Sequence, residues 1–494
     1  MREIGHWIGG GPAAGTSGRT GPVFDPATGT ETGRVALASA AEVDGAVASA
    51  RRAFEEWRAV PLGRRASVMF RLREILDAGR DDLARAVTAE HGKVLGDAAG
   101  EVDRGLENVE FACGLPHLLK GAHSSEVAGG VDVHTVLAPL GVVAGITPFN
   151  FPVMVPLWMM ANALACGNAF LLKPSERDPS ASLLLARMAA DAGFPAGVVT
   201  VVQGDHEAVD ALLAHPGVAA VSFVGSTPVA RHVYETGSRH GKRVQALGGA
   251  KNHMVVLPDA DVDAAADAAV SAGFGSAGER CMAISVLVAV GDVADRLVSA
   301  IEARIASVVI GPGASTGSQM GPLITAAHRD RVAAYVAGAA SEGARVVVDG
   351  RSARFDEGFF LGCSLVDDVK PGMRVYDDEI FGPVLSVVRV ATYADAVALV
   401  NASPYGNGVA VFTRDGGAAR RFEQEVEVGM IGVNVPIPVP VGYHSFGGWK
   451  DSLYGGSAMY GPEGIRFYTR PKVVTSRWPD PATSAVDLGF PRSR

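Results

Sequence analysis

Short apolar runs alternate with helical segments between residues 140 and about 236, and this pattern constrains the fold more than any other feature. The runs that read as strands lie at residues 140–146, 169–172, 198–202 and 218–224. Helices are predicted between and after them, at 153–166, from about 178, from about 207 and from about 228. Strands apolar on both faces and joined by helices are typical of a parallel sheet covered on both sides. Such a sheet binds its ligand beyond the carboxyl ends of the strands.

The rest of the chain adds mixed α/β structure and one extended segment. Helical spacing of apolar residues continues from about residue 41 to 119, and the second half mixes predicted helices and strands without a repeat or linker. Residues 129–136 alternate between apolar and polar, which is typical of an extended hairpin arm. The length of the chain allows two or three domains, and we expect them to pack tightly together.

Composition and charge exclude several classes of protein. Hydrophobic residues make up 48% of the 494, and the net charge of -9 has no long run of one sign, so we expect no nucleic-acid or membrane-surface patch. The first residues lack a secretory signal, and the most apolar segment, near 153–166, is too short to span a bilayer. The four cysteines include no C-x-x-C pair, which predicts reduced thiols in the cytoplasm and no metal site.

Cys281 is the candidate nucleophile. It lies in a glycine-containing loop, 276–282, that precedes a predicted strand and can expose the sulfur. A neighbouring cation would favour the reactive thiolate. The alternative is a buried and inert cysteine, which is the commoner fate of a free thiol, and the loop alone favours that alternative.

Asn150 is the candidate donor to an oxyanion. It follows the first predicted strand and lies between Pro148 and Pro152, so its position is expected to be rigid. A side-chain amide there can donate a hydrogen bond to an oxygen that gains negative charge during a reaction. The alternative is an Asx-type turn residue, and for the bare residue that is the better interpretation.

Several polar residues follow predicted strands, where a nucleotide is expected. Lys173 and Glu176 come after the second strand, and a carboxylate there can bind a ribose diol. Ser226 opens a helix whose free N–H groups can bind a pyrophosphate, although Ala230 replaces a glycine of the fuller motif. Glu379 lies beside an aromatic residue before another strand. The alternative for each is an ordinary loop residue.

Taken together and in this order, these motifs resemble the aldehyde dehydrogenase superfamily. The resemblance runs from about residue 7 to 478. It rests on the segments Pro-Phe-Asn-Phe-Pro at 148–152, Lys-Pro-Ser-Glu at 173–176, Phe-Val-Gly-Ser-Thr at 223–227, Leu-Gly-Gly at 247–249, the Cys281 loop and Glu-Ile-Phe-Gly-Pro-Val at 379–384.

Within that superfamily the chain resembles the CoA-acylating methylmalonate-semialdehyde dehydrogenase branch. The segments that carry this finer resemblance are 139–141 through 156–159, Gln-Ala-Leu-Gly-Gly-Ala-Lys-Asn-His at 245–253, Gly-Glu-Arg-Cys-Met at 278–282, Gly-Gly-Trp-Lys at 447–450 and Tyr-Gly-Pro-Glu-Gly at 460–464.

The superfamily resemblance implies a fold and an assembly. We expect a Rossmann-type NAD-binding domain at 1–120 and 140–247, an α/β catalytic domain at 248–466 and a β oligomerisation arm at 121–139 and 467–494. The arm of one subunit would cross another, so a homodimer or homotetramer is expected, and the sequence does not choose between them.

It also implies a role for each candidate. Cys281 would attack an aldehyde and become a thioester after hydride transfer to NAD, while the Asn150 amide and the Cys281 N–H would bind the alkoxide. The other cofactor contacts would be Lys173 and Glu176 at the adenosine ribose, Ser226 at the pyrophosphate, Glu379 at the nicotinamide ribose, and Phe149 and Phe381 packed nearby. Glu176 would repel a 2′-phosphate, so NAD is expected rather than NADP.

Ala246 stands where hydrolytic members of the superfamily carry the glutamate that activates water. Losing a positioned base typically costs about 10²–10⁴-fold in rate. A thiol acceptor relieves the need for that base, which points to CoA as co-substrate. The alternative is a hydrolytic aldehyde dehydrogenase of another specificity, in which Glu279 serves as the base. A second alternative is a catalytically silent relative, in which Ala246 is a plain packing position.

Arg104 and Arg280 suggest the substrate. In the semialdehyde branch, arginines at these places are associated with binding the substrate carboxylate, and a guanidinium suits a carboxylate because it binds both oxygens. The alternative for Arg104 is a surface ion pair. A carboxylate β to the thioester can leave as CO₂, so oxidation of malonate or methylmalonate semialdehyde would yield acetyl-CoA or propionyl-CoA.

Overall fold

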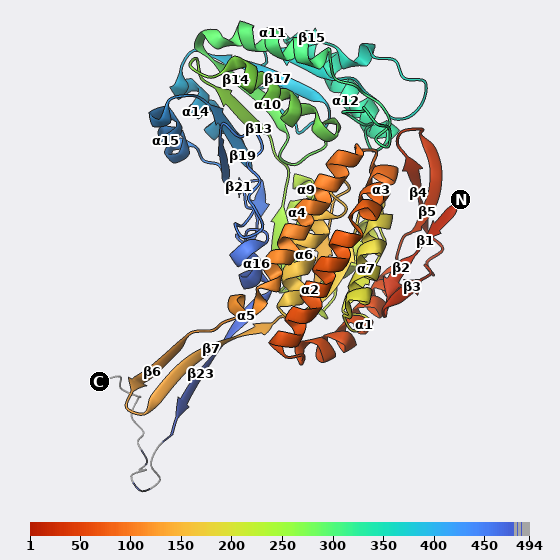
Figure 1. The fold of residues 1–494 in the computed structure, drawn as a ribbon, viewed down its shortest axis with the longest axis vertical. Helices are drawn as coiled ribbons and strands as arrows, with labels where there is room; N and C mark the ends of the chain where they lie inside the picture. The colour runs from red at the N-terminus through yellow and green to blue at the C-terminus, as the bar shows by residue number, and fades with distance from the viewer. Residues whose placement is uncertain (479–481, 483–485, 487–494) are drawn as a thin grey trace.

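The computed structural model describes residues 1–478, 482 and 486, and the remainder of the predicted arm segment 467–494 lies outside the described residues. The chain forms two α/β bodies and a projecting β arm (Figure 1). Each body is built on one large sheet. No helix among the described residues is both long and apolar enough to cross a membrane.

The first body is built on an eight-stranded sheet in the order β22-β12-β11-β8-β9-β10-β2-β3. Its strands are β2 (His6–Ile8), β3 (Gly11–Ala13), β8 (Val142–Ile146), β9 (Ala169–Lys173), β10 (Val199–Val201), β11 (Val218–Val224), β12 (Arg243–Leu247) and β22 (Leu453–Tyr454). The five central strands, β8 to β12, run parallel, which confirms the parallel sheet predicted from the alternating apolar runs. Because β22 pairs with β12, a piece of the segment 248–466 belongs to the first sheet.

Helices cover both faces of this sheet, so its strands are buried on both sides. One face carries α1 (Ala40–Arg58), α8 (His206–Ala214) and α9 (Thr227–Arg239). The other carries α2 (Leu62–Ala78), α3 (Arg80–His91), α4 (Leu95–Cys113), α6 (Met154–Ala165) and α7 (Ser180–Ala192), with the short α5 (Leu115–Leu118) and α16 (Gly461–Phe467) at its edge. A small sheet of β1 (Arg2–Ile4), β5 (Thr30–Ala36) and β4 (Thr20–Asp25) lies alongside.

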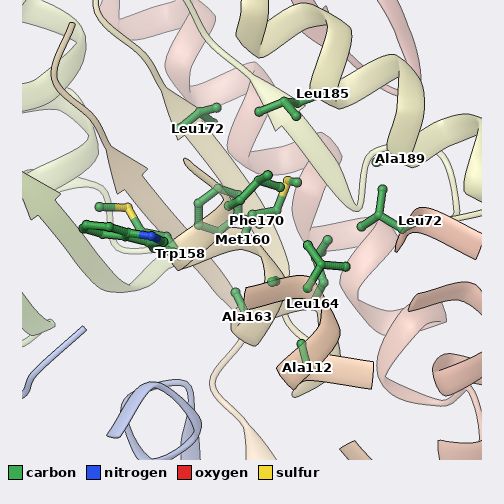
Figure 2. Packing of buried hydrophobic residues seen from close by; sticks show 14 of the residues in the cluster. Leu72, Ala112, Trp158, Met160, Ala163, Leu164, Phe170, Leu172, Leu185 and Ala189 are labelled. Atoms are coloured by element: carbon green, nitrogen blue, oxygen red, sulfur yellow. The ribbon is translucent and has the colours of Figure 1, made fainter. Parts of the chain in front are cut away.

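Helix α6 is the centre of the first core. All twelve of its residues are buried, because the sheet covers one side and α4 another. A helix that is apolar all round has to be buried in this way. Figure 2 shows Trp158 and Leu164 of α6 together with Phe170 of β9 and Leu185 of α7. The rigid α6 and β8 fix both ends of the loop that carries Asn150.

The second body is built on a seven-stranded sheet in the order β15-β16-β17-β14-β13-β19-β20, with only β15 antiparallel. Its strands are β13 (Asn252–Val256), β14 (Ile284–Val290), β15 (Arg345–Val348), β16 (Ser364–Asp367), β17 (Val384–Val390), β19 (Gly408–Phe412) and β20 (Met430–Val433). Its helices are α10 (Val262–Phe274), α11 (Ala294–Ile305), α12 (Ala326–Ala339), α13 (Arg374–Asp377), α14 (Tyr393–Ala402) and α15 (Gly416–Glu425). A two-stranded ribbon of β18 (Tyr405–Gly406) and β21 (Trp449–Lys450) lies at its edge.

The third sheet forms the arm, which projects from the first body (Figure 1). Its strands are β6 (His123–Ala128), β7 (Val131–Pro139) and β23 (Thr469–Arg477), all antiparallel, with β7 in the middle. The predicted hairpin at 129–136 contains the turn and the first part of β7, while β6 supplies its partner strand. Most of β6 is exposed, as are Val136 and Val473.

Candidate active site

The Cys281 loop lies where the carboxyl edge of the first sheet meets the amino edge of the second. It connects α10 to β14, and Ser276 and Ala277 adopt left-handed φ values of 53° and 51°. At Gly278 a Cβ atom would lie 2.2 Å from the carbonyl oxygen of Gly382, so only glycine allows this close approach. The loop is therefore held tightly against the turn that carries Glu379.

The backbone of Cys281 is fixed independently of its sulfur. Its carbonyl oxygen accepts hydrogen bonds from Asn252 Nδ2 at 2.9 Å and Asn407 Nδ2 at 3.1 Å. Cys281 is half-buried and lines a pocket together with Glu379 and Phe381. The structure thus brings the predicted nucleophile and two predicted cofactor contacts to one pocket.

The Cys281 thiol is protonated at neutral pH, contrary to the expectation that a neighbouring cation would favour a thiolate. Burial, followed by the negative charge of Glu379, raises the pKa of Cys281 to about 12. Arg280 lowers that pKa by less than burial and Glu379 raise it, and its guanidinium forms an ion pair with Asp97 on α4.

This protonation state predicts a steep pH dependence of alkylation. The thiolate is the reactive form, so the rate at which iodoacetamide labels Cys281 in the free protein should rise about tenfold per pH unit above neutrality. Labelling is measured by mass spectrometry of the Cys281 peptide, with Cys166 as the buried comparison. A rate that is already maximal near neutral pH would contradict a raised pKa.

Asn150 contacts the cysteine loop from the first body. Its side chain is 3% exposed, and Nδ2 donates a hydrogen bond to the carbonyl oxygen of Glu279 at 3.0 Å. An amide nitrogen carries two hydrogens, so one remains for a further acceptor. The carbonyl oxygen of Asn150 accepts a hydrogen bond from Lys93 Nζ at 2.6 Å. The amide that sequence reasoning selected therefore lies beside the candidate nucleophile's loop.

Glu379 is held in place by the segment that follows β12. Its Oε1 accepts a hydrogen bond from the N–H of Ala250 at 2.9 Å, and a Cβ atom at Gly249 would lie 2.3 Å from its Oε2. The N–H of Gly249 in turn donates to Thr227 Oγ1 at 2.8 Å. Burial raises the pKa of Glu379 to about 7.

Phe381 occupies a strained turn next to Glu379. Its φ is 58°, and its carbonyl oxygen accepts a hydrogen bond from His328 Nε2 at 2.7 Å. Its ring packs edge-on against Phe149, with centroids 5.9 Å apart. The His91 ring also lies 5.9 Å from Phe149. The two predicted aromatic contacts thus touch each other across the two bodies.

Lys173, Glu176 and Ser226 lie at the carboxyl edge of the first sheet. Lys173 ends β9, and its Nζ lies 3.3 Å from Glu176 Oε2; burial lowers the pKa of Lys173. Ser226 is the N-cap of α9 and is exposed, and its side chain makes no capping hydrogen bond. The first N–H groups of α9 are therefore available to an anion.

The two candidate substrate arginines each pair with a carboxylate of α4. Arg104 lies 3.0 Å from Glu107, and Arg280 pairs with Asp97. Arg104 and Cys281 both influence the pKa of the buried Tyr460, so both lie within electrostatic range of that side chain. Arg280 is adjacent to Cys281 in the chain and lines the same pocket, whereas Arg104 does not line it.

Neither candidate position places a base in the pocket. Ala246 is fully buried among apolar side chains of β12 and the helices α1, α8 and α9. Glu279 is also fully buried, and burial raises its pKa well above the usual range, which disfavours its charged form. Its Oε1 lies 3.3 Å from the N–H of Ile324, and both oxygens lie beside buried histidines. The pocket's lining includes Gly278, Arg280 and Cys281 but not Glu279.

Sequence reasoning missed the polar groups behind the site. Lys93 and Glu101 lie behind the Asn150 loop, and His91 and His328 lie beside the Glu279 carboxylate, although no local motif in the chain marks them. They come from α3 and the residues after it, from α4 and from α12, so only the tertiary structure brings them together. Among the described residues, no group of three or more His, Cys, Asp or Glu side chains is arranged to hold a metal ion.

Comparisons with known proteins identify relatives along the whole chain. A model of the aldehyde dehydrogenase family matches residues 13–474. The chain is 53% identical to a malonate-semialdehyde dehydrogenase of Pseudomonas aeruginosa, over 99% of this chain and 100% of that protein. It is 49% identical to malonate-semialdehyde dehydrogenase 3 of Geobacillus kaustophilus, over 97% of this chain and 99% of that one.

Solved structures agree with this likeness. The methylmalonate-semialdehyde dehydrogenase of Oceanimonas doudoroffii is 53% identical, with a TM-score of 0.96, and the match covers 98% of this chain and 99% of that chain. A Sinorhizobium meliloti 1021 protein, provisionally named methylmalonate-semialdehyde dehydrogenase and crystallised with NAD, is 51% identical. Its TM-score is 0.97, and the match covers 98% of this chain and 99% of that chain. The fold and the resemblance predicted from the sequence are both confirmed.

Proposed function

The chain belongs to the aldehyde dehydrogenase family, and on this premise we propose that it is a CoA-acylating, NAD-dependent dehydrogenase of malonate or methylmalonate semialdehyde. The observation that carries the acylating reaction is that neither candidate position offers a base to the pocket: Ala246 has no proton acceptor, and Glu279 is fully buried and does not line the pocket. Relatives about half identical over their full length are named for these semialdehydes.

The residues at the site fit NAD. Glu379 reaches the pocket beside Cys281, Glu176 lies at the carboxyl edge of β9, and the free N-terminus of α9 suits a pyrophosphate. NAD would supply the hydride acceptor when bound, and Glu379, which lines the pocket beside Cys281, would help to hold it. The carboxylate of Glu176 disfavours a 2′-phosphate, which supports NAD over NADP.

The chemistry follows from the positions of Cys281 and Asn150. The Cys281 thiol first gives up its proton to solvent, and Sγ then forms a bond to the aldehyde carbon while the carbonyl oxygen becomes an alkoxide. The second Nδ2 hydrogen of Asn150 and the N–H of Cys281 donate to that oxygen. When the alkoxide collapses, the carbon–hydrogen bond breaks with both its electrons, and a thioester remains on Cys281.

The thioester is then transferred to a second thiol. A thiolate is far more available than hydroxide at neutral pH, so CoA can release the acyl group without a positioned base. The carboxylate β to the thioester carbonyl leaves as CO₂, and the thioester takes up the electrons as an enolate. The products are acetyl-CoA from malonate semialdehyde and propionyl-CoA from methylmalonate semialdehyde.

NADH formation from malonate semialdehyde and from propanal, each with and without CoA, tests this proposal. We expect rapid turnover of the semialdehyde that requires CoA, with turnover lower by about 10²–10⁴-fold when CoA is left out. Equal turnover without CoA, or a preference for propanal, would overturn it. That result would favour a hydrolytic aldehyde dehydrogenase of other specificity and return attention to Glu279.

Substitution of either substrate arginine tests the carboxylate site. Arg280→Gln and Arg104→Gln should each raise the KM for malonate semialdehyde by about 10- to 100-fold, which is the loss of one charge-assisted hydrogen-bonded pair. The KM for propanal, which has no carboxylate, should change little. Arg351→Gln, at a surface pair with Asp349 far from the pocket, is the matched control. Equal increases for both aldehydes would count against the carboxylate site.

Substitution of Glu176 tests the choice of cofactor. Glu176→Ala removes the charge that repels a 2′-phosphate and leaves Lys173 to attract one, so the ratio of kcat/KM for NADP to that for NAD should rise by at least about tenfold. Steady-state rates with each cofactor measure this ratio. The control is Glu235→Ala, at an exposed carboxylate on α9, which should leave the ratio unchanged. An unchanged ratio in Glu176→Ala would show that the ribose binds elsewhere.

The arm supports assembly as a homodimer or homotetramer. Its three strands project from the first body and expose the apolar residues Val127, Val136 and Val473. An exposed edge strand with apolar residues is normally covered by another chain.

A further inference from the structure

We propose that the buried Lys93–Glu101 ion pair is a positioning device for Asn150. The pair would hold the loop that carries this amide at the distance and angle that the alkoxide requires. The proposal rests on the role of Asn150 proposed above and assigns its geometry to two residues that do not touch the substrate.

Lys93 binds the backbone carbonyl group of Asn150. It follows α3, is 1% exposed, and donates from Nζ to the Asn150 carbonyl oxygen at 2.6 Å. The same ammonium group lies 4.3 Å from the centre of the Phe151 ring, within the range of a cation–π contact. Lys93 therefore contacts two consecutive residues of the loop.

Glu101 holds the other end of the same loop. Its Oε2 accepts a hydrogen bond from Lys93 Nζ at 2.9 Å, and its Oε1 accepts from the N–H groups of Val153 at 2.7 Å and Met154 at 3.1 Å. These are the first N–H groups of α6, whose own N-cap residue, Val153, provides no capping side chain. The carboxylate from α4 thus caps α6 in its place.

The charged groups of Lys93 and Glu101 both bind residues of the segment 150–154. The pair is almost fully buried, and replacing a buried ion pair by apolar residues of similar size is often neutral for stability. What apolar residues cannot supply is direction: three hydrogen bonds from the pair fix the peptide groups at both ends of the loop. Because Asn150 Nδ2 also donates to the Glu279 carbonyl, both the backbone and the side chain of Asn150 are held.

The expected consequence is kinetic. A donor misplaced by about 1 Å can cost about 10²-fold in rate, so Lys93→Met should slow the first turnover by about 10- to 100-fold. The affinity for NAD and the KM for aldehyde should change by less than about threefold, because neither ligand touches Lys93. The measurement is the rate of the NADH burst with propanal in the absence of CoA.

A double-mutant cycle separates positioning from general destabilisation. If Lys93 acts through Asn150, the variant Lys93→Met/Asn150→Ala should be no slower than Asn150→Ala alone. The matched control is Asp367→Asn, which removes an equally buried acid from an ion pair with Arg345 and Arg389 remote from the pocket. It should lower the Tm and leave the burst rate unchanged.

Several outcomes would overturn the proposal. Multiplicative slowing in the double variant, an unchanged burst in Lys93→Met, or equal slowing in Asp367→Asn would each do so. If Lys93→Met fails to fold because Glu101 is left uncompensated, the neutral pair Lys93→Met/Glu101→Gln replaces it in the cycle. Because the burst needs neither CoA nor a semialdehyde, failure of the proposed substrate or acceptor leaves this test intact. A crystal structure of the neutral pair should show the Asn150 amide displaced.

Discussion

Cys281→Ala should lower the rate of NADH formation by at least about 10³-fold with any aldehyde, because alanine cannot form the covalent intermediate from which hydride leaves. Both the steady-state rate and the first-turnover burst should disappear. NADH absorbance with malonate semialdehyde plus CoA, and with propanal alone, measures the effect. The variant should still bind NAD, since the sulfur is not among the groups proposed to bind the ribose or the pyrophosphate.

Cys363→Ala is the matched control for this experiment. Cys363 is a buried thiol of the second body whose pKa burial also raises to about 12, and its sulfur lies 3.8 Å from that of Met320. Its loss should leave turnover unchanged and lower the Tm slightly. Retention of more than about one tenth of the activity in Cys281→Ala would require a different nucleophile, and none of the other three cysteines lines the pocket.

Asn150→Ala should lower kcat by about 10²–10³-fold, the usual effect of removing one donor from an oxyanion site. The remaining donor, the N–H of Cys281, would stabilise the alkoxide alone. The substitution also removes the hydrogen bond to the Glu279 carbonyl, so the position of the cysteine loop has to be checked in a crystal structure. Initial rates at saturating NAD and aldehyde separate kcat from KM.

The surface amide of Asn401 provides the control for Asn150. Its side chain bonds the backbone of Glu425 and Glu427, remote from Cys281, so Asn401→Ala should affect stability alone. A loss of less than about tenfold in Asn150→Ala would show that the alkoxide is stabilised chiefly by other groups. It would also remove the premise of the positioning role of Lys93.

The fold could be predicted because the information that specifies it is local. The apolar runs that became β8, β9, β10 and β11 are separated by segments with helical periodicity, and right-handed parallel connections leave few alternative topologies. The motif residues could also be placed, because Asn150, Glu176 and Ser226 follow strands of the first sheet, and Cys281 and Glu379 precede strands of the second. The return of β22 to the first sheet could not, since nothing in a two-residue strand indicates its partner.

The chain's own sequence determined the α/β architecture, the family, and the identity of the candidates Cys281, Asn150, Glu176 and Glu379. Only the tertiary structure decided their chemical state. The raised pKa values of Cys281 and Glu279 and the contacts of Lys93 all depend on burial and on residues far apart in the chain.

Arg280 shows the physical reason for this division. It is adjacent to Cys281 in sequence, yet it forms an ion pair with Asp97, 183 residues away, and lowers the pKa of the sulfur by less than burial raises it. Hydrophobic periodicity operates over a few neighbouring residues and can be read from them. Electrostatic and desolvation effects depend on every group within a few ångströms, and only the folded chain specifies which groups those are.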